Sequence, residues 1–309
     1  MVDIYKPSSD DHLSLDELSL YRLMMDYRAE NGLPAIPLSK GLTTVAGRHA
    51  LDTVENERGY VGHNWSDAPY DSADPDTYPN MWEAPQRLGT NYPGYGFEIS
   101  TGYLGNAIFN YDATPEGSLA NWQGSPGHNA VILNEGVWDE PWLAIGVGMK
   151  NGVAHVWFGR EEDRSVPQII GTRDRDKIVA TRFDDNIKAM RGDDVVKGLG
   201  GDDTLRGMAG DDKLNGGGGD DLLVGNAGDD VMIGGAGADR FLFTNRSGND
   251  VIRGFRDNDI MDLKRTSVDS FDDLEISRSG KNTVIEFADT TITLFKVHPS
   301  EIDASDFLF

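Results

Sequence analysis

The feature that most constrains this chain is a nine-residue repeat in its C-terminal half. A Gly-Asp-Asp triplet returns every nine residues, beginning at Gly192, Gly201, Gly210, Gly219 and Gly228. An apolar residue lies two positions after the second Asp of each triplet, and a second glycine column lies between the triplets. Such a strict period is typical of stacked repeat architectures, in which each copy adds one layer to a shared core.

The columns of the repeat predict short strands joined by turns that carry carboxylates. The apolar column gives each strand one inward side chain, and it contains Ile187, Val196, Leu205, Leu214, Leu223, Met232 and Phe241. Glycines permit turns with positive φ, which other residues resist. Stacked turns would bring the Asp carboxylates together, and their repulsion would be strong unless a cation lay between them. Calcium suits such a site because it binds carboxylate and backbone carbonyl oxygens alike.

The choice of acidic residue supports this interpretation. Between Arg164 and Leu274 every acidic residue is Asp and none is Glu. A surface that needed only solubility would use both, whereas a fixed short reach from a turn selects Asp. The alternative is an acidic glycine-rich linker that remains disordered. The strict register of three columns favours the folded repeat.

This segment resembles the RTX family of calcium-binding nonapeptide repeats. The resemblance implies an all-β parallel β-roll, with Ca²⁺ between turns that are stacked two repeats apart. It also implies ligands from Asp carboxylates and glycine carbonyls. The predicted metal-site residues are Asp185, Gly192, Asp194, Gly198, Gly201, Asp203, Gly207, Gly210, Asp212, Gly216, Gly219, Asp221, Gly225, Gly228, Asp230, Gly234 and Asp239. Leu199, Met208 and Asn226 stand where the family has its second glycine.

The composition of the chain changes near residue 160, where a mixed sequence with tryptophans gives way to glycine and aspartate. We therefore expect an N-terminal extension at 1–13, a first domain at 14–160, a linker at 161–173, a β-roll at 174–255 and a β-rich cap at 256–309. The net charge of −24 argues against nucleic acid or anionic membrane as the main partner, because both repel a polyanion. The chain has no cysteine, which excludes disulfides and thiol chemistry.

The first domain mixes helical and strand patterns and is predicted to be α/β. A capping box at Ser14–Glu17 opens one predicted helix, and a second is predicted from near Ser39 to Val54. Residues 66–95 are rich in Asp, Pro, Tyr and Asn and are predicted to be a long surface loop. Buried strands or short helices are predicted near 130–133, 143–148 and 153–158.

Several segments of this domain resemble the CAP superfamily (cysteine-rich secretory, antigen 5 and pathogenesis-related-1 proteins; SCP-like) in its bacterial cysteine-free form. The most telling is Trp122-Gln123-Gly124-Ser125-Pro126-Gly127-His128-Asn129. Others lie at 27–33, 48–52, 62–64, 96–99, 145–148 and 156–159. The resemblance implies an α-β-α sandwich with a cleft lined by two histidines and two acidic residues. His63, Glu98 and His128 match three of these positions, while Ser125 stands in place of the second acid.

These three residues leave two interpretations open. Two neutral imidazoles and a carboxylate can hold Zn²⁺ with an open position for water, or can act as acid and base. They can equally form a buried hydrogen-bonded cluster that stabilises the cleft. His49 lies on an apolar helix face and is predicted to be a core histidine, while His155 and His12 are assigned no role.

Other catalytic patterns are absent from the sequence. It contains no His-Glu-x-x-His metalloprotease motif. Ser125 does not form Gly-x-Ser-x-Gly, because Gln123 stands where the first glycine belongs. The glycine-rich region has the wrong period and charge for a phosphate-binding loop.

The two ends of the chain bear on localisation. The N-terminus shows no basic region followed by an apolar run, as a cleavable secretory signal would. Asp306-Phe307-Leu308-Phe309 resembles the C-terminal signal of type I secretion substrates. We therefore expect an extracellular protein, exported by type I machinery, whose CAP-like domain binds an extracellular lipid, glycan or protein. The alternative is an extracellular, peptidase-like hydrolase that uses His63, Glu98 and His128 with or without zinc.

Overall fold

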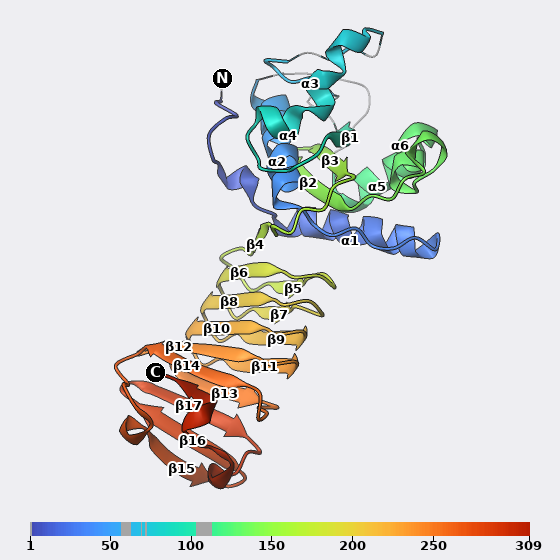
Figure 1. Ribbon diagram of the computed structural model, residues 1–309. Coiled ribbons are helices and arrows are strands. Elements are labelled where there is room, and N and C mark those ends of the chain that lie inside the picture. Colours follow the sequence, from blue (N-terminus) through green and yellow to red (C-terminus); the bar gives the residue numbers. More distant parts are fainter. Residues whose placement is uncertain (1, 57–62, 69, 72, 103–112) are drawn as a thin grey trace. The chain divides into compact units, whose positions relative to one another are not determined.

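The computed structural model describes residues 2–56, 63–68, 70–71, 73–102 and 113–309 (Figure 1). The chain forms two compact units, Met1–Gln168 and Ile169–Phe309. The division falls inside the segment predicted to be a linker. None of the helices in the described part of the chain is long and apolar enough to span a membrane.

The N-terminal unit contains six described α-helices. They are α1 (Leu15–Glu30), α2 (Lys40–Glu55), α3 (Pro79–Trp82), α4 (Ala84–Arg87), α5 (Pro115–Gln123) and α6 (Pro126–Ile132). Short 3-10 helices lie at Ser9–Asp11, Pro75–Thr77 and Gly136–Trp138. The two predicted N-terminal helices are confirmed, and Ser14 and Glu17 form the capping box that opens α1. Residues 66–95, predicted to be a long surface loop with little regular structure, contain the four-residue helices α3 and α4, each with a proline in its first turn.

A three-stranded antiparallel sheet forms the middle layer of this unit. Its strands are β1 (Gly96–Gly102), β2 (Ala144–Lys150) and β3 (Val153–Gly159), in the order β1-β3-β2. Helix α2 packs on one face at very short range. A Cβ atom on Gly146 would lie 2.0 Å from the backbone of Leu42, and one on Gly148 would lie 2.2 Å from that of Ala46. Both glycines of β2 therefore allow the close approach of α2.

Helices α5 and α6 cover the opposite face of the sheet. The Trp122 indole N–H of α5 donates to the Ser100 carbonyl of β1 (3.1 Å). The Trp142 indole N–H, just before β2, donates to the Val131 carbonyl of α6 (2.8 Å). Helix α1 is joined to α6 by a hydrogen bond from the Tyr27 hydroxyl to Asn129 (2.9 Å). The predicted α-β-α sandwich is confirmed.

The C-terminal unit is a roll of two stacked sheets. One contains β4 (Gln168–Ile170), β6 (Asn186–Arg191), β8 (Thr204–Ala209), β10 (Leu222–Ala227), β12 (Arg240–Thr244), β14 (Ile260–Arg265) and β18 (Phe307–Leu308). The other contains β5 (Lys177–Val179), β7 (Val195–Lys197), β9 (Lys213–Gly218), β11 (Val231–Ala236), β13 (Asn249–Arg253), β17 (Thr290–Phe295), β16 (Asn282–Phe287) and β15 (Glu275–Ser279). Figure 1 shows the even and odd strands stacked as two ladders.

Each turn of the roll is formed by two nonapeptide repeats. Leu205 pairs with Ile187 on one side and with Leu223 on the other, so parallel neighbours are two repeats apart. The side chains of all three are fully buried between the sheets. The predicted parallel β-roll is confirmed, with parallel pairs running from β5 to β13 in one sheet and from β6 to β14 in the other.

The C-terminal segment continues both sheets and adds 3-10 helices at Phe271–Asp273, Pro299–Glu301 and Ala304–Asp306. Strand β17 pairs in parallel with β13, and β18 pairs in parallel with β14. Strands β15, β16 and β17 pair antiparallel with one another. The predicted β-rich cap is therefore built onto the open end of the same core.

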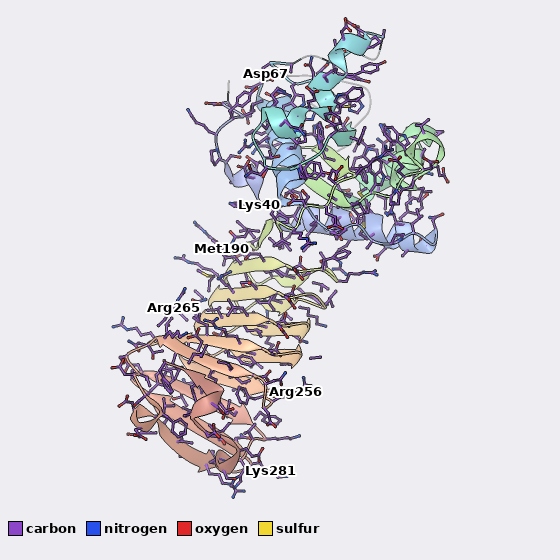
Figure 2. The ribbon with its side chains drawn as sticks, in the orientation of Figure 1. Lys40, Asp67, Met190, Arg256, Arg265 and Lys281 are labelled. Atoms are coloured by element: carbon purple, nitrogen blue, oxygen red, sulfur yellow. The ribbon has the colours of Figure 1, made fainter. Side chains whose placement is uncertain are left out.

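Four non-glycine residues at equivalent positions of the nonapeptide repeat adopt a left-handed backbone conformation. They are Met190, Leu199, Met208 and Asn226, with φ between 75° and 91°. Three of them are the positions where the repeat departs from glycine, and Met190 of β6 occupies the equivalent position (Figure 2). The stacked turns impose this conformation even where a side chain disfavours it.

Candidate metal centres

The second Asp of each triplet forms a buried column along the turns of the roll. The predicted residues Asp185, Asp194, Asp203, Asp212, Asp221, Asp230 and Asp239 all lie in it, with at most 4% of each residue exposed. In all of these residues except Asp185, one carboxylate oxygen accepts a backbone N–H from the turn two repeats earlier. For Asp212, for example, Oδ1 accepts the N–H of Asp194 at 2.8 Å. These hydrogen bonds fix the carboxylates in register.

The other carboxylate oxygen has no partner in most of the column. Among the described residues, Oδ2 is buried without a hydrogen bond in Asp194, Asp203, Asp212, Asp221, Asp230, Asp239 and Asp250. Burial raises the pKa of Asp203 to about 8 and that of Asp212 to about 7, and neighbouring carboxylates add to both shifts. Buried, unpaired carboxylate oxygens are costly unless a cation binds them. The donor set fits Ca²⁺, which prefers oxygen ligands.

The predicted glycines border these oxygens in two ways. A Cβ atom on Gly207 would lie 2.1 Å from Oδ2 of Asp212, and the equivalent glycines in other turns are as close to their own Asp. Gly198, Gly216, Gly225 and Gly234 are those equivalents. The triplet glycines instead approach the backbone of the turn two repeats earlier. A Cβ atom on Gly210 would lie 2.0 Å from the carbonyl oxygen of Gly192. Glycine in both columns therefore keeps space for the stacked turns and their carboxylates.

Two differences separate the observed column from the predicted one. At Asp185, Oδ2 accepts the N–H and hydroxyl of Thr181 at 2.8 and 2.9 Å, so this carboxylate has a protein partner. Asp250 and Asp259 continue the column, because their Oδ1 atoms accept the N–H groups of Asp230 and Asp239. Oδ2 of Asp259 accepts the N–H of Arg256 at 2.9 Å, so this carboxylate, like that of Asp185, has a protein partner. The sequence pattern continues through 247–252, but neither residue was included in the predicted metal-site set, because two extra residues before Asp250 interrupt the nine-residue spacing.

The N-terminal unit contains a second cluster, centred on Glu98 of β1. The Glu98 side chain is fully buried, and its Oε2 lies 2.8 Å from Nδ1 of His63. Its Oε1 lies 2.5 Å from Nδ1 of His155 on β3 and 2.6 Å from Nδ1 of His49 on α2. Both of these histidine side chains are fully buried, whereas that of His63 is 26% exposed.

The predicted trio of His63, Glu98 and His128 is only partly assembled by direct contact. His63 hydrogen bonds with Glu98, while His128, on α6, has a buried Nδ1 atom without a partner among the described residues. Burial lowers the pKa of His128, and the nearby His63 lowers it further. Gly62, which belongs to the motif around His63, lies outside the described residues.

Two histidines that the sequence did not assign to the site contact Glu98 directly. His49 is buried as predicted for a core histidine, but it also faces the carboxylate, and His155 was given no role. The only available signal was the alternation of β3, which places His155 on the same face as Trp157. His49, Glu98 and His155 each offer one possible metal-ligand atom, and these atoms all lie within 4.8 Å of one another.

The electrostatics of this cluster favour one ionised carboxylate among histidines. Burial opposes the charge on Glu98, but His49 and His155 outweigh it and hold the pKa of Glu98 well below its usual range. Burial, reinforced by His49, lowers the pKa of His155 to about 4. For His49, burial is outweighed by Glu98, and the pKa is raised. A buried carboxylate with three imidazoles around it can bind a cation or position a proton.

Comparison with known proteins identifies the roll. Residues 170–205, 206–241 and 246–265 match the family model of the RTX calcium-binding nonapeptide repeat. Residues 170–265 are an RTX repeat region. The Asp residues whose Oδ2 atoms have no partner among the described residues all lie within the matched segments of this RTX region. Among curated proteins, none matches this sequence.

Similar solved structures cover parts of the chain. An extracellular protein containing a SCP domain from Bacillus anthracis str. Ames is 18% identical, with a TM-score of 0.36, and the match covers 47% of this chain and 40% of that one. For the extracellular lipase LipA from Serratia marcescens, the identity is 16%, the TM-score 0.23 and the coverage 48% and 41%. The AlgE6R2 subunit of the Azotobacter vinelandii mannuronan C5-epimerase is 25% identical, with a TM-score of 0.29, and the match covers 46% of this chain and 92% of that one. This chain thus spans less than half the length of the first two proteins.

Proposed function

We propose that this protein works outside the cell and that calcium binding folds its RTX region. The observation that carries the proposal is the column of buried Asp residues, in most of which Oδ2 has no hydrogen-bond partner in the described part of the chain. Calcium between the turns would supply that partner and remove the repulsion between neighbouring carboxylates. Because the site exists only when the turns are stacked, binding free energy becomes folding free energy.

This coupling suits export in an unfolded form. Cytosolic calcium is scarce, so the acidic turns would repel one another and the roll would stay open until the chain reached calcium-rich surroundings. Transport by a type I system, with the C-terminal segment as its signal, is part of the same proposal. The calcium ligands in it are the Asp carboxylates and glycine carbonyls of the predicted set, extended to Asp250 and Asp259.

For the N-terminal unit we propose a binding or effector role toward an extracellular lipid, glycan or protein. A run of aromatic rings supports it, because His63 contacts Tyr70, Tyr70 contacts Tyr78, and Tyr78 contacts Trp82. The run ends at Tyr95, which is 54% exposed. Tyr95 also lines a surface pocket of about 570 Å³. Exposed aromatic rings beside a polar cluster offer both stacking and hydrogen-bonding contacts to a ligand.

A hydrolase is the second candidate, and the His63–Glu98 hydrogen bond favours it. Glu98 is buried and orients a partly exposed imidazole, which is the arrangement of a general base with its orienting carboxylate. His128 would be the second proton-transfer group. In this candidate, Zn²⁺ held in the cleft is an optional addition.

Calcium titration of the full chain tests the main proposal. After calcium is removed with a chelator, far-UV circular dichroism should show lost β-structure, and added millimolar Ca²⁺ should restore it. Mg²⁺ at the same concentration is the control, because it demands a stricter geometry. A spectrum that does not respond to calcium would contradict the proposal.

The two roles of the N-terminal unit are separated by a double variant, His63→Ala with His128→Ala. If the unit is a hydrolase, the folded variant loses hydrolysis of peptide or ester substrates while its target binding persists. If the variant retains all hydrolysis, or the wild type shows none, the binding role stands.

A further inference from the structure

The cluster of His49, Glu98 and His155 contains an electrostatic conflict that the hydrogen bonds of the N-terminal unit do not resolve. Nε2 of His49 lies 2.6 Å from the carbonyl oxygen of Asn64. A carbonyl oxygen only accepts, so Nε2 of His49 carries a proton. In the neutral ring, Nδ1 then presents a lone pair.

That lone pair faces another acceptor. Nδ1 of His49 lies 2.6 Å from Oε1 of Glu98 and is buried, and without a proton on Nδ1 the two atoms cannot form a hydrogen bond. With neutral His49 the two acceptor atoms would repel at this distance, so a cation must lie beside both of them. The cation is either a proton on His49 or a metal ion.

The third member of the cluster favours a metal ion. Nδ1 of His155 approaches the same Oε1 atom at 2.5 Å, so two imidazole nitrogens flank one carboxylate oxygen, and the three residues offer ligand atoms within 4.8 Å of one another. The far nitrogen of His155 is held by the hydroxyl of Thr53 at 3.2 Å, as that of His49 is held by Asn64. Metal-binding histidines are typically anchored in this way through the nitrogen that does not bind the metal.

We infer that His49, Glu98 and His155 form a buried site for a divalent transition-metal ion of the zinc class. Two imidazoles and a carboxylate suit Zn²⁺, whereas calcium prefers oxygen ligands alone. The site differs from the predicted trio, since it shares only Glu98 with it. His63 binds the other oxygen of Glu98 and links the site to the surface. The chain would then carry zinc in its N-terminal unit and calcium in its RTX region.

Burial decides how the metal enters. The side chains of all three residues are 0% exposed. His49 also stacks on Trp65, with ring centroids 4.1 Å apart. The ion must therefore bind during folding, and it should exchange slowly afterwards.

The test uses the full chain refolded with Zn²⁺ and then dialysed against excess Ca²⁺, which competes for the RTX carboxylates. Elemental analysis should find one zinc per wild-type chain. His49→Gln and His155→Asn should each lose it, whereas His63→Ala and His298→Ala should retain it. His298 is an exposed histidine of the C-terminal unit and serves as the matched control. Wild-type protein without zinc would overturn the inference and assign the proton to His49. Loss of zinc in His63→Ala with retention in His155→Asn would also overturn it.

A second measurement covers the case in which the buried variants fail to fold. Wild-type chain refolded with Co²⁺ in excess Ca²⁺ should show the visible absorption bands of nitrogen-ligated cobalt. Its tryptophan fluorescence should be weaker than that of the zinc form, because Trp65 and Trp157 lie beside His49. If cobalt produces neither change, the inference fails whatever the variants do.

Discussion

At the residue scale, both units contain buried acceptor atoms without a protein partner among the described residues, but the kinds of acceptor atom differ. Each buries carboxylates that accept protein hydrogen bonds and still leave acceptor atoms in need of a cation. In the RTX region the surplus acceptors are Asp Oδ2 atoms, for which calcium is suited. Around Glu98 they are imidazole nitrogens as well, for which a softer ion or a proton is suited. The kind of donor atom, more than the net charge, separates the two centres.

Asp212 provides a prediction with a neighbour as its control. Asp212→Asn keeps an acceptor for the N–H of Asp194 but loses the charge, so calcium-dependent stability should fall by about 2 kcal/mol. Asp211→Asn alters an exposed carboxylate of the same triplet and should change it much less. Isothermal calorimetry and thermal unfolding with and without calcium measure both. Equal effects of the two substitutions would count against the inner Asp as the calcium ligand.

Glu17 gives a pH dependence to the N-terminal unit. Burial raises its pKa from 4.5 to about 7, against the hydrogen bonds it accepts from the N–H groups of Ser14 and Met149. Asp10 adds a smaller upward shift. Because the folded state holds the proton more tightly, this contribution is complete below pH 4.5 and is lost as pH rises through about 7. The loss is on the order of 3 kcal/mol.

Glu17→Gln isolates this contribution. The amide cannot accept from both N–H groups, so the variant should be less stable by about 1–3 kcal/mol. The stability advantage of the wild type should shrink as pH rises from 4.5 to 7. Urea unfolding followed by tryptophan fluorescence measures it, with Asp16→Asn at the exposed neighbouring position as the control. If the stability advantage of the wild type grows with pH instead, the hydrogen bonds from the two N–H groups stabilise the charged carboxylate more than burial destabilises it.

At the element scale, glycine sets how closely the turns of the RTX region stack. Gly219 has φ of +122°, and a Cβ atom there would lie 2.3 Å from the carbonyl oxygen of Gly201. The adjacent Gly218 would place its Cβ no nearer than 4.0 Å to Ala236, with no positive φ. Of these two consecutive glycines, therefore, only Gly219 is required by the stacking of the turns.

We predict that Gly219→Ala destabilises the roll by about 2 kcal/mol or more, because both the conformation and the space exclude a side chain. Gly218→Ala should be neutral or stabilising by up to about 1 kcal/mol, since it restricts only the unfolded chain. Thermal unfolding in saturating calcium, followed by far-UV circular dichroism, compares the pair. Similar losses in both variants would show that the turn spacing is not what limits stability.

At the scale of the whole molecule, calcium should act on one unit only. All six tryptophans lie in the N-terminal unit, at residues 65, 82, 122, 138, 142 and 157. Tryptophan fluorescence therefore reports that unit, while circular dichroism at β-sheet wavelengths reports both.

Removing calcium should lower the unfolding temperature seen by circular dichroism and leave the one seen by tryptophan fluorescence nearly unchanged. The reason is that the Asp column lies entirely in the C-terminal unit. If the buried histidine site binds zinc, zinc added during refolding should change the unfolding temperature seen by tryptophan fluorescence and leave the unfolding of the C-terminal unit nearly unchanged. A fluorescence transition that moves with calcium would indicate that the two units unfold as one.

The sequence alone was sufficient for the RTX region because its information is local. A repeat of nine residues states which side chains face inward, which turns need glycine and which carboxylates align, and the parallel roll follows from stacking. The α-β-α fold and the His63–Glu98 pair also followed from motifs. Where two extra residues interrupted the count, at Asp250 and Asp259, the local rule failed although the column continued.

Only the tertiary structure revealed the surroundings of Glu98. His49 and His155 are 106 residues apart in the chain, on a helix and a strand that carry no shared pattern. They meet because Gly146 and Gly148 let α2 approach the sheet closely, which is a packing property that no spacing of histidines encodes. In a repeat, the residues that meet in space are separated by a fixed number of residues in the sequence, so the sequence alone predicts the calcium site. A buried cluster such as that around Glu98 instead depends on how separate helices and strands pack.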